Sequence, residues 1–145
     1  MSPFGRSMIK LFGKLHKALY QKTGSRPFAR LGKMPNLLLT TTGRKSGKLR
    51  TIPLLYIENG DGFAIVASFA GAPEHPSWYL NLQSNPKATV QIGKQVIPVI
   101  AITASPEEKE SLWPRFTAMY ADYDNYENAT KRDIPVVLLR VVDTA

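Results

Sequence analysis

The stretch from Asn36 to Tyr56 constrains the fold of this chain more than any other. It reads NLLLTTT, then GRKSGK, then LRTIPLLY, so that two apolar, branched runs flank a turn bounded by Gly43 and Gly47. Branched and apolar side chains suit a pleated, half-buried backbone, and glycine supplies the unusual dihedrals of a tight turn. The sequence therefore predicts a β-hairpin with the GRKSGK segment at its tip.

The tip of this hairpin is strongly basic. Four cations and one hydroxyl lie on it or beside it: Arg44, Lys45, Ser46, Lys48 and Arg50. Guanidinium, ammonium and backbone N–H groups can together hold a phosphate or a carboxylate, although the loop alone is equally compatible with a solvated basic hairpin. It lacks the GxxxxGK[ST] spacing of a Walker loop, and no helix is expected to follow it.

The distribution of charge indicates an anionic partner. The chain has 145 residues, a formal net charge of +8 and no cysteine, which excludes disulfides and thiolate catalysis. No Asp or Glu precedes Glu58, whereas Lys and Arg recur throughout that first part. Nucleic acid, an anionic membrane surface and a polyanionic small molecule are all open. The two histidines, His16 and His75, are far apart, so no metal site is expected.

Residues 1–35 are expected to form an amphipathic basic helix and a connector, ahead of a cofactor-binding domain at 36–145. From Ser7 to Gln21 the apolar residues follow helical spacing: Met8, Leu11, Phe12, Leu15 and Leu19. Such a helix can pack on its own domain or on a second subunit, or it can lie on anionic lipid. No apolar run is long enough to span a membrane, and lysines interrupt any signal-peptide pattern.

The remainder predicts short strands joined as hairpins, with few helices. Strands are expected at Phe63–Phe69, Ala88–Ile92, Gln95–Thr103 and Ile134–Val142, and Pro98 indicates an edge strand or a bulge. Ser77 is expected to cap a helix over Trp78–Gln83. A capping box at Ser105–Glu108 is expected to begin a second helix that reaches about Ala121, and no helix or strand is predicted for Asp122–Asp133. The fold class is therefore mainly β (α+β), a small barrel of about six antiparallel strands with two or three helices.

Three further features lie downstream of the basic hairpin. They are the VAS segment ending at Ser68, the PSWYLNL segment from Pro76, and tyrosines at 120, 123 and 126. Each has a plain explanation when it stands alone: Ser68 can simply end a strand, Trp78 can be a core residue, and tyrosines often shield apolar area.

Together these segments resemble the deazaflavin-dependent nitroreductase family. The resemblance covers residues 36 to 142 and is carried by TTTGRKSGKLRTIPLLY, IVASFAGAPEHPSWYLNLQSNP, WPRFTAMYADYDNY and TKRDIPVVLL. It implies a split β-barrel of the FMN-binding type and an oxidoreductase. The reaction it implies is hydride transfer from reduced coenzyme F420, an 8-hydroxy-5-deazaflavin, to a quinone, nitroaromatic or activated enone. FMN is the less favoured cofactor, and a non-catalytic carrier module for a flavin-type cofactor is the alternative.

The resemblance also implies a set of site residues. The coenzyme is a polyanion with a phosphodiester and an oligoglutamate tail, and the residues expected to bind it are Arg44, Lys45, Ser46, Arg50, Thr51, Ile52, Pro53, Leu54, Leu55, Val66, Ala67, Ser68, Phe69, Ser77, Trp78, Tyr79, Leu80, Asn81 and Tyr123. Tyr123 and Ser68 are the expected catalytic residues, and Trp78, Tyr120, Tyr123 and Tyr126 are expected to contact the acceptor. Some family members carry a basic residue where this chain has Phe69.

The expected partners follow from the same reasoning. They are a small-molecule hydride acceptor and a second copy of the chain in a homodimer. Nucleic acid is not expected, because no aromatic residues are interleaved with the basic ones. The expected location is cytoplasmic, with docking on the inner face of the cell membrane through the N-terminal helix.

Overall fold

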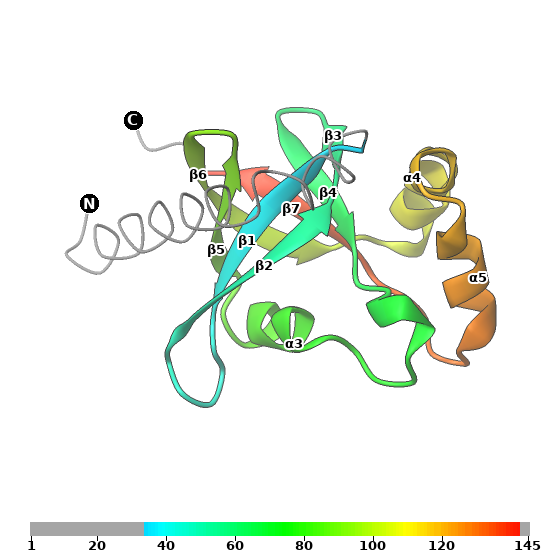
Figure 1. Cartoon of the computed structure of the whole chain (residues 1–145), viewed down its shortest axis with the longest axis horizontal. Helices are drawn as coiled ribbons and strands as arrows, with labels where there is room; N and C mark the ends of the chain where they lie inside the picture. Colours follow the sequence, from blue (N-terminus) through cyan, green and yellow to red (C-terminus); the bar gives the residue numbers. More distant parts are fainter. Residues whose placement is uncertain (1–33, 143–145) are drawn as a thin grey trace, which may run out of the picture.

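The computed structural model describes residues 34–142 (Figure 1). Its elements are β1 (Asn36–Thr42), β2 (Leu49–Leu55), β3 (Ile57–Asn59), β4 (Gly62–Val66), the 3-10 turn η1 (Phe69–Gly71), α3 (Ser77–Ser84), β5 (Lys87–Ile92), β6 (Gln95–Thr103), α4 (Pro106–Met119), α5 (Asp122–Ala129) and β7 (Val136–Val141). The predicted N-terminal helix lies outside the described residues, as does most of the connector that follows it.

The predicted hairpin is confirmed. β1 and β2 pair antiparallel from Asn36 opposite Leu55 to Thr42 opposite Leu49. Gly47 has a φ of +74°, as a tight turn requires. Gly43 serves a different purpose, because a Cβ there would lie 2.9 Å from Ser46 Oγ and 3.1 Å from the Lys48 carbonyl oxygen. The tip is thus closed by a near approach of the backbone.

All seven strands of the described part form one antiparallel sheet in the order β2-β1-β5-β6-β7-β4-β3. The sheet curves into a half-barrel with β2 and β3 as its two edges (Figure 1). There is one strand more than predicted, because the short segment Ile57–Asn59, which follows the second predicted run and was given no strand, forms β3. The residues before Tyr56 pair with β1, and those after it pair with β4 at the opposite edge.

The edge-strand prediction for Pro98 is wrong. β6 lies inside the sheet between β5 and β7, with Pro98 opposite Thr89. The proline is tolerated because β7 ends at Val141, one residue short of the position that would pair with Pro98, so no strand residue there requires an N–H donor from it. Val142 N still donates to the Pro98 carbonyl oxygen at 2.9 Å, so at most one ladder hydrogen bond is lost.

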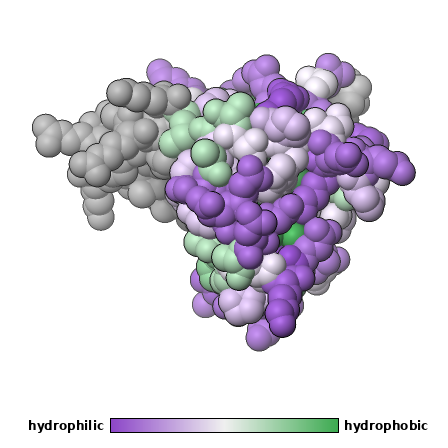
Figure 2. All heavy atoms as spheres, turned by 90° about the vertical axis from the view of Figure 1, so that its right-hand side faces the viewer, coloured by the Kyte–Doolittle hydropathy of each residue, from purple (hydrophilic) through white to green (hydrophobic). Residues whose placement is uncertain are grey.

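A hydrophobic cluster lies on each face of the sheet, and neighbouring residues of β4 belong to different clusters. Ile65 points into a cluster with Leu39, Val90 and Trp78 of α3, whereas Ala64 points into the cluster that contains Phe116 of α4. This alternation follows from the two-residue period of a strand. Helix α3 thus covers one face and α4 and α5 the other; hydrophilic residues cover much of the side on which α4 and α5 lie (Figure 2).

The helices agree with the sequence in part. The capping box of α4 is confirmed, since Ser105 Oγ accepts from Glu108 N and Glu108 Oε1 accepts from Ser105 N. The prediction that Ser77 caps α3 is wrong: the N-cap is Pro76, without a side-chain bond. Helix α5 was not predicted, because its mostly polar sequence DYDNYENA has little apolar periodicity. Within the described residues, no helix has the length and apolarity to cross a membrane.

Candidate active site

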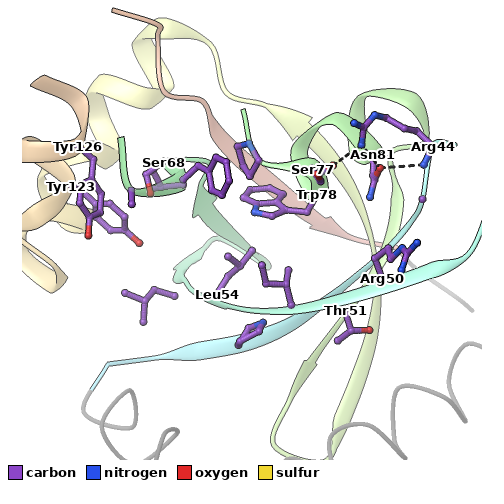
Figure 3. A pocket seen from close by; sticks show the side chains of 18 of the residues that line it. Arg44, Arg50, Thr51, Leu54, Ser68, Ser77, Trp78, Asn81, Tyr123 and Tyr126 are labelled. Atoms are coloured by element: carbon purple, nitrogen blue, oxygen red, sulfur yellow. Dashed lines mark hydrogen bonds between the residues drawn. The ribbon is translucent and has the colours of Figure 1, made fainter. Parts of the chain in front are cut away.

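A pocket of about 940 Å³ lies between β2, the segment after β4, α3 and α5. The residues predicted for the site that line it are Arg44, Lys45, Ser46, Arg50, Thr51, Ile52, Pro53, Leu54, Leu55, Val66, Ser68, Phe69, Ser77, Trp78, Asn81, Tyr120, Tyr123 and Tyr126. Tyr123 and Tyr126 lie at one end of the pocket and Arg44 and Arg50 at the other, with Ser68 and Trp78 between them (Figure 3). The structure therefore brings the hairpin tip and the tyrosine cluster to opposite ends of one space.

Three residues expected at the site do not line the pocket. Ala67 is fully buried in the core, and its N–H donates to the Pro135 carbonyl oxygen at 2.9 Å. Tyr79 is buried, and its hydroxyl is hydrogen-bonded to Thr103 Oγ1 at 2.9 Å. Leu80 is absent from the lining. Neighbouring residues of a strand or helix point in different directions, so a contiguous motif contributes only some of its side chains.

At the basic end, Asn81 fixes the position of Arg44. Its Oδ1 accepts from Arg44 N at 3.1 Å and from Arg44 Nη1 at 3.0 Å. Its Nδ2 donates to Thr41 Oγ1 at 3.1 Å in a buried contact, and the Asn81 side chain is itself only 3% exposed. One amide on α3 thus connects β1 to the tip, and Arg44 is held before any ligand binds.

The other cations of the tip are free to meet an anion. Lys45 and Arg50 are exposed, and neither forms an ion pair within the described range 34–142. Ser46 Oγ accepts from Lys48 N at 3.1 Å, so this hydroxyl stabilises the turn itself. Positive charge without a protein counter-charge is what an anionic ligand would neutralise.

Between the two ends, the chain makes a left-handed turn. The strand predicted to run to Phe69 ends at Val66, and Phe69, Ala70 and Gly71 have φ of 45°, 52° and 78°. Phe69 and Ala70 are the only non-glycine residues with positive φ in the described part of the chain. Each such residue costs about 1–3 kcal/mol. The turn leaves Ser68 buried against the pocket and Phe69 51% exposed at its mouth.

Arg132 holds this turn, and the sequence interpretation missed it. Its guanidinium donates to the carbonyl oxygens of Ser68 at 2.8 Å, Ala72 at 2.9 Å and Ala67 at 3.3 Å. Nη1 also donates to His75 Nδ1 at 3.1 Å, and burial lowers the pKa of Arg132. The resemblance included TKRDIP, but nothing in one sequence shows which carbonyls an arginine reaches.

His75 is neutral in this arrangement. Arginine has only donors, so Nδ1 of His75 accepts and its proton is on Nε2. Desolvation and then the Arg132 charge lower the pKa of His75, whereas Asp133 opposes them. The ring also contacts that of Tyr79, with centroids 4.9 Å apart.

At the other end, the tyrosines differ in their hydrogen bonding. The Tyr120 and Tyr126 hydroxyls bond to each other at 2.8 Å, and this bond, followed by burial, raises the pKa of Tyr120. Tyr123 is 6% exposed, and desolvation followed by the Tyr126 charge raises its pKa to about 12. Among the described residues its hydroxyl has no hydrogen-bond partner. Tyr123 therefore keeps a proton that it can donate into the pocket.

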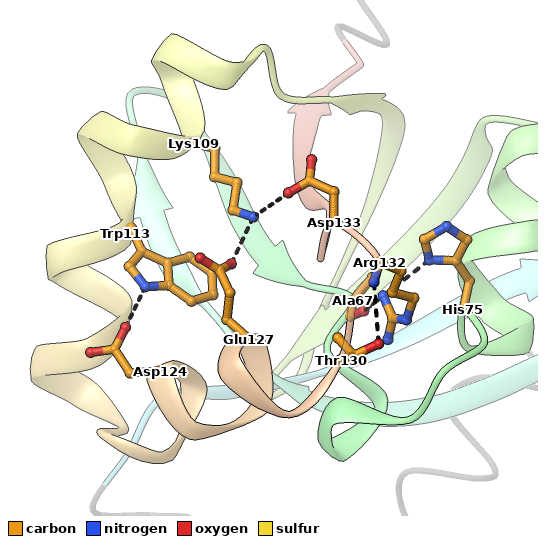
Figure 4. A network of polar contacts seen from close by, with 9 residues as sticks. All are labelled: Ala67, His75, Lys109, Trp113, Asp124, Glu127, Thr130, Arg132 and Asp133. Atoms are coloured by element: carbon orange, nitrogen blue, oxygen red, sulfur yellow. Dashed lines mark hydrogen bonds and ion pairs between the residues drawn. The ribbon is translucent and has the colours of Figure 1, made fainter.

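A polar network attaches the helix that carries these tyrosines (Figure 4). Lys109 Nζ of α4 lies 2.8 Å from Glu127 Oε2 of α5 and 3.0 Å from Asp133 Oδ1. Trp113 Nε1 donates to Asp124 Oδ1 at 2.8 Å, and Lys109 Nζ lies 5.0 Å from the Trp113 ring centroid. These contacts join α4 to α5 and to the segment before β7.

Comparison with known proteins matches this chain to one family. A family model described as F420H(2)-dependent quinone reductase matches residues 12–141. The F420H(2)-dependent quinone reductase of Mycobacterium tuberculosis is 40% identical over 130 residues, which cover 87% of this chain and 87% of that protein.

Two solved structures are similar to this one. An F420-H2 dependent reductase matches with a TM-score of 0.67 and 43% identity, over 73% of this chain and 94% of that one. Another, described as a domain-swapped dimer, has the same TM-score of 0.67 and identity of 43%, over 73% of this chain and 80% of that one. The predicted fold is confirmed at this level, as a split-barrel-like half-barrel.

Proposed function

Because the chain belongs to the F420H(2)-dependent quinone reductase family, we propose that it is an oxidoreductase that uses reduced coenzyme F420 to reduce quinones. The observation that carries this proposal is the two-ended pocket, with unpaired cations at one end and an unpaired tyrosine hydroxyl at the other. When bound, the reduced deazaflavin supplies the hydride.

The pocket suits a flat ring joined to a polyanionic tail. Its basic end offers Arg44, Lys45 and Arg50, which can neutralise phosphate and carboxylate groups. Its middle is apolar, with Leu54, Trp78 and other apolar side chains that exclude water from a ring. The size of about 940 Å³ leaves room for a second small molecule beside such a ring.

The residues at the tyrosine end have roles that their geometry supports. Tyr123 donates its proton to the acceptor oxygen, because its hydroxyl is unpaired and its raised pKa keeps it protonated. Ser68 supplies a second polar contact beside the reacting ring. Tyr120, Tyr126 and Trp78 shape the space for the acceptor, and the hydrogen bond between Tyr120 and Tyr126 keeps that wall rigid.

Spectral titration tests the proposal against its alternative. Purified protein is mixed with reduced coenzyme F420, and separately with reduced FMN, before a soluble quinone is added. Deazaflavin oxidation that requires both protein and quinone supports the reductase. Tight binding without oxidation would instead make the protein a carrier.

The proposal also concerns other acceptors, the assembly and the membrane. Nitroaromatics can be acceptors at the same site, and a panel that contains quinones and nitroaromatics measures which of the two is reduced faster. A homodimer is tested by light scattering. Peripheral membrane docking through residues 1–33 is tested by liposome co-sedimentation with and without that segment; equal partitioning of the two forms would reject it.

A further inference from the structure

We infer that Arg132 is a positioning residue that holds the left-handed turn, and with it Ser68 and Phe69, in place at the pocket. The inference rests on the proposed function and deepens it, because it concerns the same pocket. Arg132 does not line that pocket. It acts through the backbone of the residues that do.

The turn needs an external support. Phe69 and Ala70 both adopt the left-handed region that only glycine enters without strain. Two hydrogen bonds close the turn from within: Gly71 N donates to the Ser68 carbonyl oxygen at 2.9 Å, and Ala72 N to that of Phe69 at 3.0 Å. Strained conformations of this kind persist only where the surroundings fix them.

Arg132 meets the turn on both sides of the strained residues. It donates to the Ala67 and Ser68 carbonyl oxygens before them and to the Ala72 carbonyl oxygen after them. A planar guanidinium offers five N–H donors in fixed directions, whereas an ammonium is a compact point charge. The shape of the arginine head group, and not only its charge, is therefore required.

The charge of Arg132 is not used in an ion pair. Within residues 34–142, the ion pairs are those of Lys109, and they include Asp133, the neighbour of Arg132. Arg132 instead binds neutral acceptors, namely three carbonyl oxygens and His75 Nδ1. Arg132 therefore orients the backbone through hydrogen bonds. A surface ion pair would not need several carbonyl oxygens directed at one guanidinium.

Helix α5 also confines the turn. A Cβ at Gly71 would lie 2.9 Å from the Tyr126 carbonyl oxygen, so the turn packs directly against the helix that bears Tyr123. If Arg132 lost its bonds, the turn could relax, and Ser68 and Phe69 would shift relative to Tyr123. The basic end of the pocket, on the β1–β2 hairpin, would not move with them.

The test compares Arg132→Lys and Arg132→Met with Arg140→Lys, a control at an exposed arginine of β7. Hydrogen exchange of the Gly71 and Ala72 amides, followed by NMR on isotope-labelled protein, reads the turn directly. Coenzyme affinity reports on the basic end of the pocket, and kcat/KM for a soluble benzoquinone reports on the end where the tyrosines lie. If the Met variant does not fold, the Lys variant alone decides.

In Arg132→Lys we expect both amides to exchange about tenfold faster or more and kcat/KM to fall by about tenfold, because small misplacements of reacting groups reduce rates strongly. Coenzyme affinity should change by less than about threefold, an energy below that of one charge-assisted hydrogen bond. Exchange and kcat/KM equal to those of Arg140→Lys would overturn the inference. So would a lower melting temperature with unchanged kinetics per folded molecule. Wild-type protein that never oxidises the coenzyme would instead refute the proposed function, and the exchange measurement would still test Arg132.

Discussion

Replacing Asn81 by leucine separates the organisation of the basic end from its charge. The substitution keeps a side chain of similar size, so it leaves little empty space, but it removes three hydrogen bonds. Two of them come from Arg44 and one goes to Thr41. No cation is deleted, and the exposed surface of the tip stays the same.

The cost in stability follows from the contacts. A net hydrogen bond contributes about 0.5–1.5 kcal/mol, and more when a buried partner is left unsatisfied, so Asn81→Leu should lower the free energy of unfolding by about 2–4 kcal/mol. For a chain of this size that is a fall in Tm of about 10 °C. Arg44 would keep only its long 3.5 Å contact with the Ser77 carbonyl oxygen, so the ligand must order its side chain, and coenzyme affinity should fall by about tenfold, equivalent to 1.4 kcal/mol.

The matched control is Thr41→Val. It removes only the bond from Asn81 Nδ2 and leaves both contacts to Arg44. It should cost about 1–2 kcal/mol of stability and leave coenzyme affinity within about twofold. Thermal unfolding and fluorescence quenching of the coenzyme measure the two effects. If Asn81→Leu loses stability but binds the coenzyme as wild type does, Asn81 does not position Arg44 for the anion.

Four other substitutions test the remaining parts of the pocket and the contact between His75 and Arg132. Lys45→Ala or Arg50→Ala should raise the Kd of the coenzyme by about 10- to 100-fold with little change in Tm, since each removes a charge-assisted bond from an exposed side chain; unchanged fluorescence titrations in both would refute the anion clamp. Tyr123→Phe keeps the ring and deletes the donor, so kcat should fall by about 10²–10⁴-fold while coenzyme affinity holds, and turnover within about twofold of wild type would mean that the tyrosines only cover the barrel. The pKa of His75 is lowered in the folded protein, so as pH falls below about 6.5 the unfolded chain takes up a proton first and Tm should drop. His75→Asn, which offers an oxygen acceptor and does not titrate, should show a flatter profile of Tm against pH; equal slopes would contradict the assignment of a neutral His75 facing Arg132.

The parts of the fold that depend on residues close together in the chain could be predicted from the sequence. The hairpin tip and the Ser105 capping box each depend on residues within one turn, and both were predicted correctly. Pro98 was misjudged because its tolerance depends on where a distant strand ends. Helix α5 was missed because Lys109 and Trp113 of α4 stabilise it through long-range contacts that leave no periodic signal.

The candidate site shows the same division. Sequence motifs identified most of the pocket residues as contiguous segments, yet the side chains of Ala67 and Tyr79 point into the core. The residues that hold the pocket in shape were harder to recognise. The contacts of Arg132 are made with residues at least 57 positions away in the chain, apart from its own backbone bond to Thr130. Such pairings are a property of the fold.

The position of α4 and α5 in the chain has a consequence for how this protein can change its acceptor. Both helices lie in one continuous insertion, residues 104–135, between β6 and β7, which pair directly with each other. The sheet and the basic hairpin are therefore complete without them. The insertion contains all three pocket tyrosines and also Arg132, its own attachment to the turn. Under the proposed function this insertion carries the residues that would select the acceptor, so we expect a chimaera that receives residues 104–135 of a relative to adopt the relative's acceptor preference while keeping its own affinity for the coenzyme.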